Sequence, residues 1–163
     1  MNYDEFIRNK KHSAKKGGFS PVYMPSGCFD FQESIITQCL GHGRYAGFVD
    51  TGLGKTLIQL AIARNCAEKL NKRVLIITPL AVAYQFIDEA EKFDICQPKY
   101  SKDGTISSDV VICNYERLDK FNPDDFGAVI LDESSILKNF DGKIKSQVTA
   151  FLKRVKYRFL FTA

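Results

Sequence analysis

Five short segments of this chain are rich in apolar residues, and most carry no polar residue at alternate positions. They are YAGFVD (45–50), RVLIITP (73–79), DVVICNY (109–115), AVILDE (128–133) and YRFLFTA (157–163). Apolar side chains on both faces of a strand are typical of a sheet that is covered on both sides. Helical patterns separate these segments at 55–70, 81–93 and 142–155. The alternation predicts an α/β fold with a mainly parallel sheet flanked by helices, and ligands at the carboxyl ends of its strands.

Length and composition agree with one compact domain. The chain has 163 residues, of which 45% are hydrophobic and 26% charged, as in ordinary globular proteins. Its five cysteines are scattered singly, which argues against a zinc site or a disulfide framework and favours a reducing, cytoplasmic setting. We expect no membrane partner, because no apolar run is long enough to span a bilayer and the N-terminus lacks the apolar core of a secretory signal.

The two ends of the chain differ from its middle. Residues 1–27 are polar, basic and interrupted by KKGGFSP and MPSG, so we predict a basic irregular arm at 1–27 and a domain at 28–163.

The net charge of +4 permits a phosphate-backbone partner but does not require one. Since the chain stops at the tip of a predicted strand, we expect it to be part of a longer protein.

The junction GFVDTGLGKTLIQLAIA (47–63) has the context of a phosphate-binding loop. It follows a predicted strand, opens a predicted helix and carries Gly-Lys-Thr between them. Glycines let backbone N–H groups converge on phosphate oxygens, and the helix N-terminus adds positive potential. Lys55 is expected to reach the β- and γ-phosphates of ATP, and the Thr56 hydroxyl to ligate Mg²⁺. The predicted nucleotide-binding residues of the loop are Thr51, Gly52, Leu53, Gly54, Lys55 and Thr56.

One position departs from the full pattern G-x-x-x-x-G-K-[ST]. The chain has Val49 where that pattern has its first glycine. The alternative interpretation is a tight strand-to-helix turn whose Lys55 only faces solvent.

A pair of carboxylates supports the nucleotide site independently. Asp132 and Glu133 follow the apolar segment AVIL, and in a parallel sheet that end lies beside the phosphate loop. Asp132 is suited to hold Mg²⁺, and Glu133 to polarise the water that attacks the γ-phosphate. Together with Lys55 they are the predicted catalytic residues.

These segments resemble the first RecA-like domain of superfamily 2 helicases and translocases, especially the Swi/Snf-like branch and phage or bacterial DEAD/DEAH-type relatives. VDTGLGKT is similar to motif I of that superfamily, A-x-x-G-x-G-K-T, with Val49 in place of the alanine. DESSILKN matches motif II of the branch, D-E-x-x-x-[IL]-K-N, and FLFTA matches the start of motif III. The resemblance covers residues 29–163 and implies a RecA-like P-loop NTPase that uses ATP and Mg²⁺.

The resemblance also implies roles for single residues. FDFQESI is similar to the glutamine-containing motif, in which Gln32 would contact the adenine edge and a preceding aromatic residue such as Phe19 would stack on the base. The remaining implied roles are nucleic-acid contacts by Thr78, Pro79, Tyr115 and Lys138, and coupling of the ATP state to nucleic-acid grip by Ser135 and Thr162. Ser135 is a departure, because DEAD and DEAH families carry Asp or His there.

Motif II favours DNA over RNA as the partner, bound through its backbone without sequence recognition. Two motor domains are needed for movement along nucleic acid, so the resemblance implies a second RecA-like domain, in the same chain after residue 163 or in another subunit. Two alternatives stay open: an ATP-binding regulatory or interaction module without motor activity, and a small P-loop kinase. The kinase is disfavoured because the sequence has no arginine-rich lid segment.

Overall fold

The computed structural model describes residues 17–139 and 141–163. Within this part of the chain, six strands form one sheet in the order β1-β6-β5-β2-β4-β3, and every neighbouring pair is parallel. The strands are β1 (Arg44–Phe48), β2 (Arg73–Ile77), β3 (Lys99–Tyr100), β4 (Val110–Cys113), β5 (Phe126–Leu131) and β6 (Tyr157–Thr162). The predicted parallel α/β architecture is confirmed.

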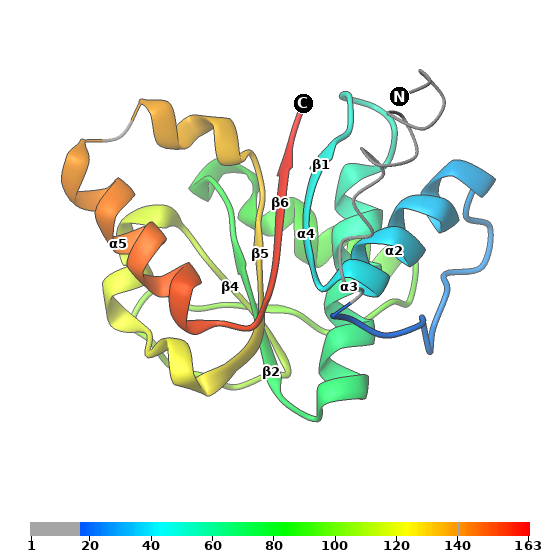
Figure 1. Ribbon diagram of the computed structural model, residues 1–163, viewed down its shortest axis with the longest axis horizontal. Coiled ribbons are helices and arrows are strands. Elements are labelled where there is room, and N and C mark those ends of the chain that lie inside the picture. Colours follow the sequence, from blue (N-terminus) through cyan, green and yellow to red (C-terminus); the bar gives the residue numbers. More distant parts are fainter. Residues whose placement is uncertain (1–16, 140) are drawn as a thin grey trace, which may run out of the picture.

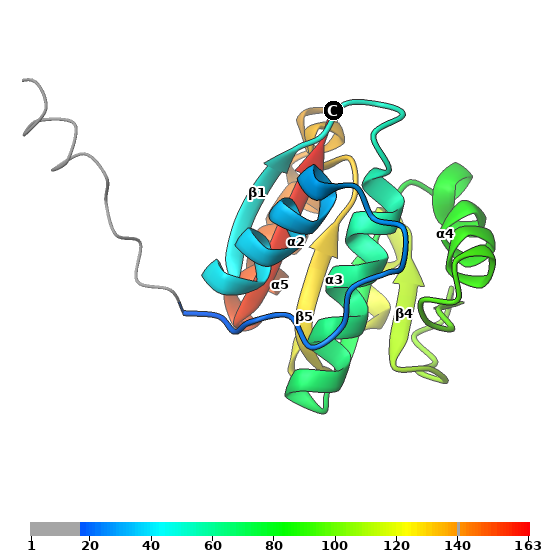
Figure 2. The same ribbon diagram turned by 90° about the vertical axis from the view of Figure 1, so that its right-hand side faces the viewer.

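Helices cover both faces of the sheet. In Figure 1, α5 lies on one side of the strands, and α2 and α3 lie on the other; Figure 2 shows α2 and α3 in front of the strands and α4 at the right, beside β4. The α-helices are α2 (Asp30–His42), α3 (Lys55–Leu70), α4 (Leu80–Lys92) and α5 (Gly142–Arg154). Three short 3₁₀ helices complete the described chain: η1 (Tyr115–Lys120), η2 (Pro123–Asp125) and η3 (Ser134–Lys138).

The uninterrupted apolar runs of the central strands are explained by the two covered faces. Successive side chains of a strand point to opposite faces. Along β2, Val74 and Ile76 join the core that contains residues of α2, α3 and α4, whereas Leu75 and Ile77 join the core that contains Val148 and Phe151 of α5. Every residue of β4 and β5 is buried. No position of these two strands faces water, so neither needs a polar residue.

Helix α2 is not among the elements predicted from the sequence. Its N-cap position is held by Phe29, whose side chain cannot accept a hydrogen bond from the first turn as Ser, Thr, Asp or Asn would. Its buried face has a helical spacing but begins with the polar Gln32, followed by Ile36, Cys39 and Leu40. Both features weaken the sequence signal for a helix at this place.

The segment that precedes α2 is irregular, and it packs against α3. Residues 1–16 of the predicted N-terminal arm lie outside the described residues. Further along, the backbone N–H groups of Val22 and Tyr23 both donate to Asn65 Oδ1, at 2.7 and 3.0 Å. Asn65 Nδ2 donates in turn to the carbonyl oxygens of Tyr23 and Ala61. One buried amide therefore fastens the segment to α3.

None of the helices in the described part of the chain is long and apolar enough to cross a membrane.

The contacts of Asn65 predict a large stability loss for Asn65→Ala. The variant removes the acceptor of two part-buried hydrogen bonds, from the N–H groups of Val22 and Tyr23, and a donor left unsatisfied away from water costs about 1–3 kcal/mol. Chemical denaturation should show a loss of about 2–3 kcal/mol, whereas Gln38→Ala on the exposed face of α2 should change stability little. A loss below about 0.5 kcal/mol in Asn65→Ala would contradict this role.

Candidate functional site

The loop between β1 and α3 has the backbone of a phosphate-binding turn. Gly52 and Gly54 adopt left-handed conformations, with φ of 85° and 77°, which other residues rarely tolerate. Val49, at the position of the missing first glycine, is 2% exposed, and its N–H donates to the Thr162 carbonyl oxygen at 3.0 Å. The apolar Val49 side chain anchors the start of the loop in the core, and the Val49 N–H extends the pairing of β1 with β6.

The sheet order brings the predicted motifs to one edge. The carboxyl ends of β1, β6, β5 and β2 are neighbours in this order, and Figure 1 shows the loop that follows β1 beside the end of β6. The Nζ atom of Lys55 lies 2.8 Å from Glu133 Oε2 and 3.5 Å from Asp132 Oδ1. The three predicted catalytic residues therefore meet, although Lys55 and the acidic pair are more than 70 positions apart in the sequence.

Asp132 is held from two directions. It is 4% exposed. Its Oδ1 accepts a hydrogen bond from Gln59 Nε2 at 2.8 Å, and its Oδ2 accepts one from the Thr78 hydroxyl at 3.0 Å. No motif of the sequence marks Gln59. The available signal was a polar residue four positions after Lys55, on the same side of the helix, and the one polar residue within the apolar stretch 57–63.

Glu133 links the acidic strand end to two other motifs. Its backbone is left-handed, with φ of 52°, a conformation that is uncommon outside glycine. Its Oε1 accepts hydrogen bonds from the hydroxyls of Ser135 and Thr162, each at 3.0 Å. Both residues predicted to couple the ATP state to nucleic-acid grip thus bind one carboxylate oxygen.

The ion pair shifts the pKa values of both partners. The hydrogen bond from Lys55, reinforced by those from Ser135 and Thr162, lowers the pKa of Glu133 to about 2 against the opposing effect of partial burial. Burial would lower the pKa of Lys55, but the hydrogen bond to Glu133 and the charge of Asp132 outweigh it and raise that pKa. Glu133 is ionised and Lys55 is charged at neutral pH.

Gln32 packs against the phosphate loop. Its Nε2 donates to the Leu53 carbonyl oxygen at 3.0 Å, and its Oε1 accepts from the Phe29 N–H at 3.1 Å. A Cβ atom at Gly54 would clash with that Nε2 unless the Gln32 side chain moved, so this close approach of Gln32 depends on the glycine. Helix α2 and the phosphate loop therefore support each other's position.

A hollow of about 690 Å³ joins these elements. Its walls include the phosphate loop, Asp132 and Glu133, the start of α2 and residues of α4. Phe29 and Phe31 lie on its rim as a stacked pair, with ring centroids 5.9 Å apart and planes 9° apart. Phe19, the aromatic residue suggested by the sequence, instead packs edge-on against Tyr157, 5.7 Å away, and does not line this hollow.

The residues predicted to contact nucleic acid divide into two groups. Thr78 and Tyr115 are buried, at 0% and 1% exposure, and their hydroxyls donate to the side chain and the carbonyl oxygen of Asp132. Neither hydroxyl is accessible to a nucleic acid in this structure. Burial raises the pKa of Tyr115, which keeps its hydroxyl protonated as a donor. Lys138 is exposed and Pro79 is partly exposed.

The donor set fits a magnesium ion bound together with a nucleotide. Mg²⁺ prefers hard oxygen ligands, and in nucleotide sites it is bound through one or two carboxylates plus phosphates and waters. Asp132 supplies a carboxylate, and the Thr56 hydroxyl makes no hydrogen bond within the described residues. Within the described residues, no group of three or more His, Cys, Asp or Glu side chains could hold a metal ion by itself.

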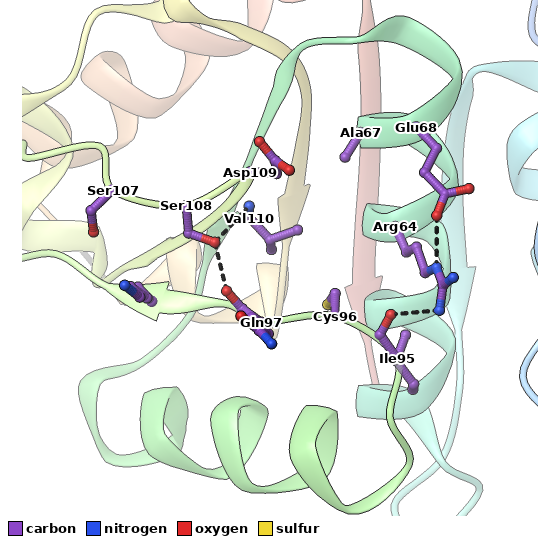
Figure 3. A pocket seen from close by; sticks show the side chains of 11 residues that line it. Arg64, Ala67, Glu68, Ile95, Cys96, Gln97, Ser107, Ser108, Asp109 and Val110 are labelled. Atoms are coloured by element: carbon purple, nitrogen blue, oxygen red, sulfur yellow. Dashed lines mark hydrogen bonds and ion pairs between the residues drawn. The ribbon is translucent and has the colours of Figure 1, made fainter.

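A second hollow, of about 490 Å³, lies beside the C-terminal half of α3 and the start of β4, away from the phosphate loop (Figure 3). Several of its polar side chains are bonded to other groups of the protein. Arg64 donates to Glu68 and to the Ile95 carbonyl oxygen, and the Ser108 hydroxyl donates to the Gln97 carbonyl oxygen. Burial raises the pKa of the Cys96 thiol to about 12, so this cysteine is not a reactive thiolate. This hollow therefore offers no reactive thiolate, and Arg64 and Ser108 are already engaged within the protein.

Comparison with known proteins identifies the family. The family model described as DEAD/DEAH box helicase matches residues 29–163. The chain belongs to this family, and its fold is the RecA-like α/β domain of superfamily 2 helicases. A comparison with curated protein sequences found no significant match.

Solved structures share the fold. The UvsW helicase from bacteriophage T4 superposes with a TM-score of 0.72 at 21% identity, over 87% of this chain and 55% of that one. The Sulfolobus solfataricus SWI2/SNF2 ATPase core in complex with dsDNA gives a TM-score of 0.71 at 23% identity, over 88% of this chain and 33% of that one. This chain therefore spans about half or a third of the length of the structures it resembles.

The lowered pKa of Glu133 predicts how acid affects the ion pair. A carboxylate whose pKa falls from 4.5 to about 2 on folding stabilises the protein fully above about pH 4.5 and loses this effect as the pH falls toward 2. The stability difference between wild type and Glu133→Gln, measured by chemical denaturation, should stay constant down to about pH 5 and shrink below it. Because the Glu133 side chain is 35% exposed, solvent screening reduces the size of this stability difference. A difference that vanished above pH 5 would contradict the assignment.

Proposed function

We propose that this domain binds ATP with Mg²⁺ and hydrolyses it in response to nucleic acid, as the first RecA-like domain of a DNA helicase or double-stranded DNA translocase. The observation that carries the proposal is the contact of Lys55, at the end of the phosphate loop, with both Asp132 and Glu133. Membership of the DEAD/DEAH box helicase family supports the same function.

The contacts of the site suggest how its residues act. The backbone N–H groups of the phosphate loop, at the N-terminus of α3, are suited to bind phosphate oxygens. Lys55 can exchange Glu133 for these oxygens, which leaves the ionised Glu133 to accept a hydrogen bond from water as a base. Thr56 and Asp132 would hold Mg²⁺, which when bound neutralises charge on the phosphates.

The partners are part of the proposal. The Swi/Snf-like form of motif II favours double-stranded DNA over RNA, and the Sulfolobus structure with the same fold was determined with dsDNA. The exposed Lys138 is available for a backbone contact. Full activity would need a second RecA-like domain, because arginine residues supplied across such a site contribute about 10³–10⁵ in rate in related phosphoryl-transfer enzymes. The domain alone would hydrolyse ATP slowly.

The alternative is a regulatory module that binds ATP and docks a partner without motor activity. Stimulation of ATP hydrolysis by double-stranded DNA in the intact protein separates the two, since only the motor requires it.

The phosphate-loop assignment predicts that Lys55→Ala loses ATP binding. Removal of a charged donor to the phosphates should weaken the affinity by about 100-fold or more, as measured by calorimetry with Mg²⁺. Lys69→Ala is the matched control, because Lys69 is an exposed lysine in the last turn of the same helix and its loss should leave the affinity unchanged. Equal affinities in Lys55→Ala and wild type would exclude Lys55 from the site.

The role of Glu133 predicts a different result for Glu133→Gln. In the intact protein this variant should bind ATP and Mg²⁺ with nearly normal affinity, because the side chain keeps its shape, while DNA-stimulated hydrolysis falls by about 10²–10⁴. Binding is measured by calorimetry and hydrolysis by phosphate release. Turnover within threefold of wild type would remove Glu133 from its role as the base.

A further inference from the structure

Gln59 is a buried polar residue of α3 that no recognised motif includes. It lies one turn after Lys55 and Thr56 on the same helix and is 0% exposed. Its Nε2 donates to Asp132 Oδ1 at 2.8 Å. Its Oε1 is the one buried side-chain polar atom without a hydrogen-bond partner among the described residues.

The unpartnered oxygen follows from the contact with Asp132. An ionised carboxylate only accepts hydrogen bonds, so the amide must present its nitrogen to Asp132 and turn its oxygen away. A flipped amide would place two acceptors against each other. A buried polar group without a partner costs about 1–3 kcal/mol, and a leucine or methionine would fill the same space without this cost. The glutamine is therefore unfavourable for packing alone.

The two donors to Asp132 act on different oxygens. Gln59, from α3, binds Oδ1, while Thr78, just after β2, binds Oδ2. Together they fix the rotation of the carboxylate about its Cβ–Cγ bond. Each oxygen keeps lone-pair capacity for a further partner, since an ionised carboxylate accepts up to about four hydrogen bonds. The carboxylate is thus oriented while it stays able to bind a cation.

We propose that Gln59 is a positioning residue of the magnesium site, which orients the Asp132 carboxylate so that Mg²⁺ binds together with ATP. The inference rests on the proposed ATP-binding function. Gln59 is buried and does not line the hollow beside the phosphate loop, so in this role it acts through Asp132. Because Thr56 and Gln59 belong to the same turn region of α3, the helix that opens at the phosphate loop also sets the orientation of the acidic strand end.

A purely structural role makes a different prediction. If Gln59 only joins α3 to β5, its replacement changes stability and leaves the magnesium dependence of ATP binding as it is. If it orients Asp132, its replacement raises the Mg²⁺ concentration needed for ATP binding. Partners that orient metal-binding side chains typically contribute 10–100-fold to metal affinity.

The test uses the full chain with Mg²⁺ and ATP as probes. Wild type, Gln59→Leu and Gln59→Asn are titrated with Mg²⁺ at fixed ATP, and ATP affinity is also measured in EDTA, both by calorimetry. Leucine removes the amide, and asparagine withdraws it by one methylene; thermal unfolding without nucleotide reports on the fold of each variant. The matched control is Gln38→Leu, a glutamine on the exposed side of α2.

We expect the Mg²⁺ midpoint to rise by about 10–100-fold in both Gln59 variants, with ATP affinity in EDTA within twofold of wild type and no change in Gln38→Leu. If Gln59→Leu does not fold, Gln59→Asn provides the test of the Mg²⁺ midpoint. Midpoints within twofold of wild type would overturn the role of Gln59 and leave the proposed function standing. A wild-type protein without any Mg²⁺-dependent ATP binding would overturn the proposed function itself.

Discussion

The contact of Lys55 with Asp132 and Glu133 is the interaction on which the site depends. It joins the loop after β1 to the end of β5, two segments that are far apart in the sequence. A carboxylate as buried as Asp132 needs compensating partners, and it obtains them from Lys55, Gln59 and Thr78. The phosphate loop, its helix and the end of β2 are therefore arranged around one buried acidic group.

Glu133 extends this arrangement toward β6. The carboxylate that pairs with Lys55 also accepts hydrogen bonds from Ser135 and Thr162. Glu133 thus joins Lys55, at the start of α3, to Thr162, at the end of β6, through a single side chain. The serine in place of the Asp or His of motif II is compatible with this link, because its hydroxyl supplies the donor.

The sequence predicted the architecture well in segments that are dominated by one type of residue. The apolar runs of β2, β4 and β5 and the glycine-rich junction before α3 each have one physical explanation, and the structure and the family match confirm the fold that they predict. The sequence did not predict α2, because its first turn lacks a polar cap and its buried face includes Gln32. Gln59 was missed because a single glutamine within the apolar stretch 57–63 belongs to no motif.

By itself, the sequence determined the parallel α/β fold and the motifs at the strand ends, since the order of strands and helices and the type of residue at each junction are local properties. Only the tertiary structure decided which side chains share the site. It buries Thr78 and Tyr115 against Asp132 and places Gln59 there as well. Such contacts depend on which strands are neighbours and which way each helix faces, and this information arises only when the whole sheet is assembled.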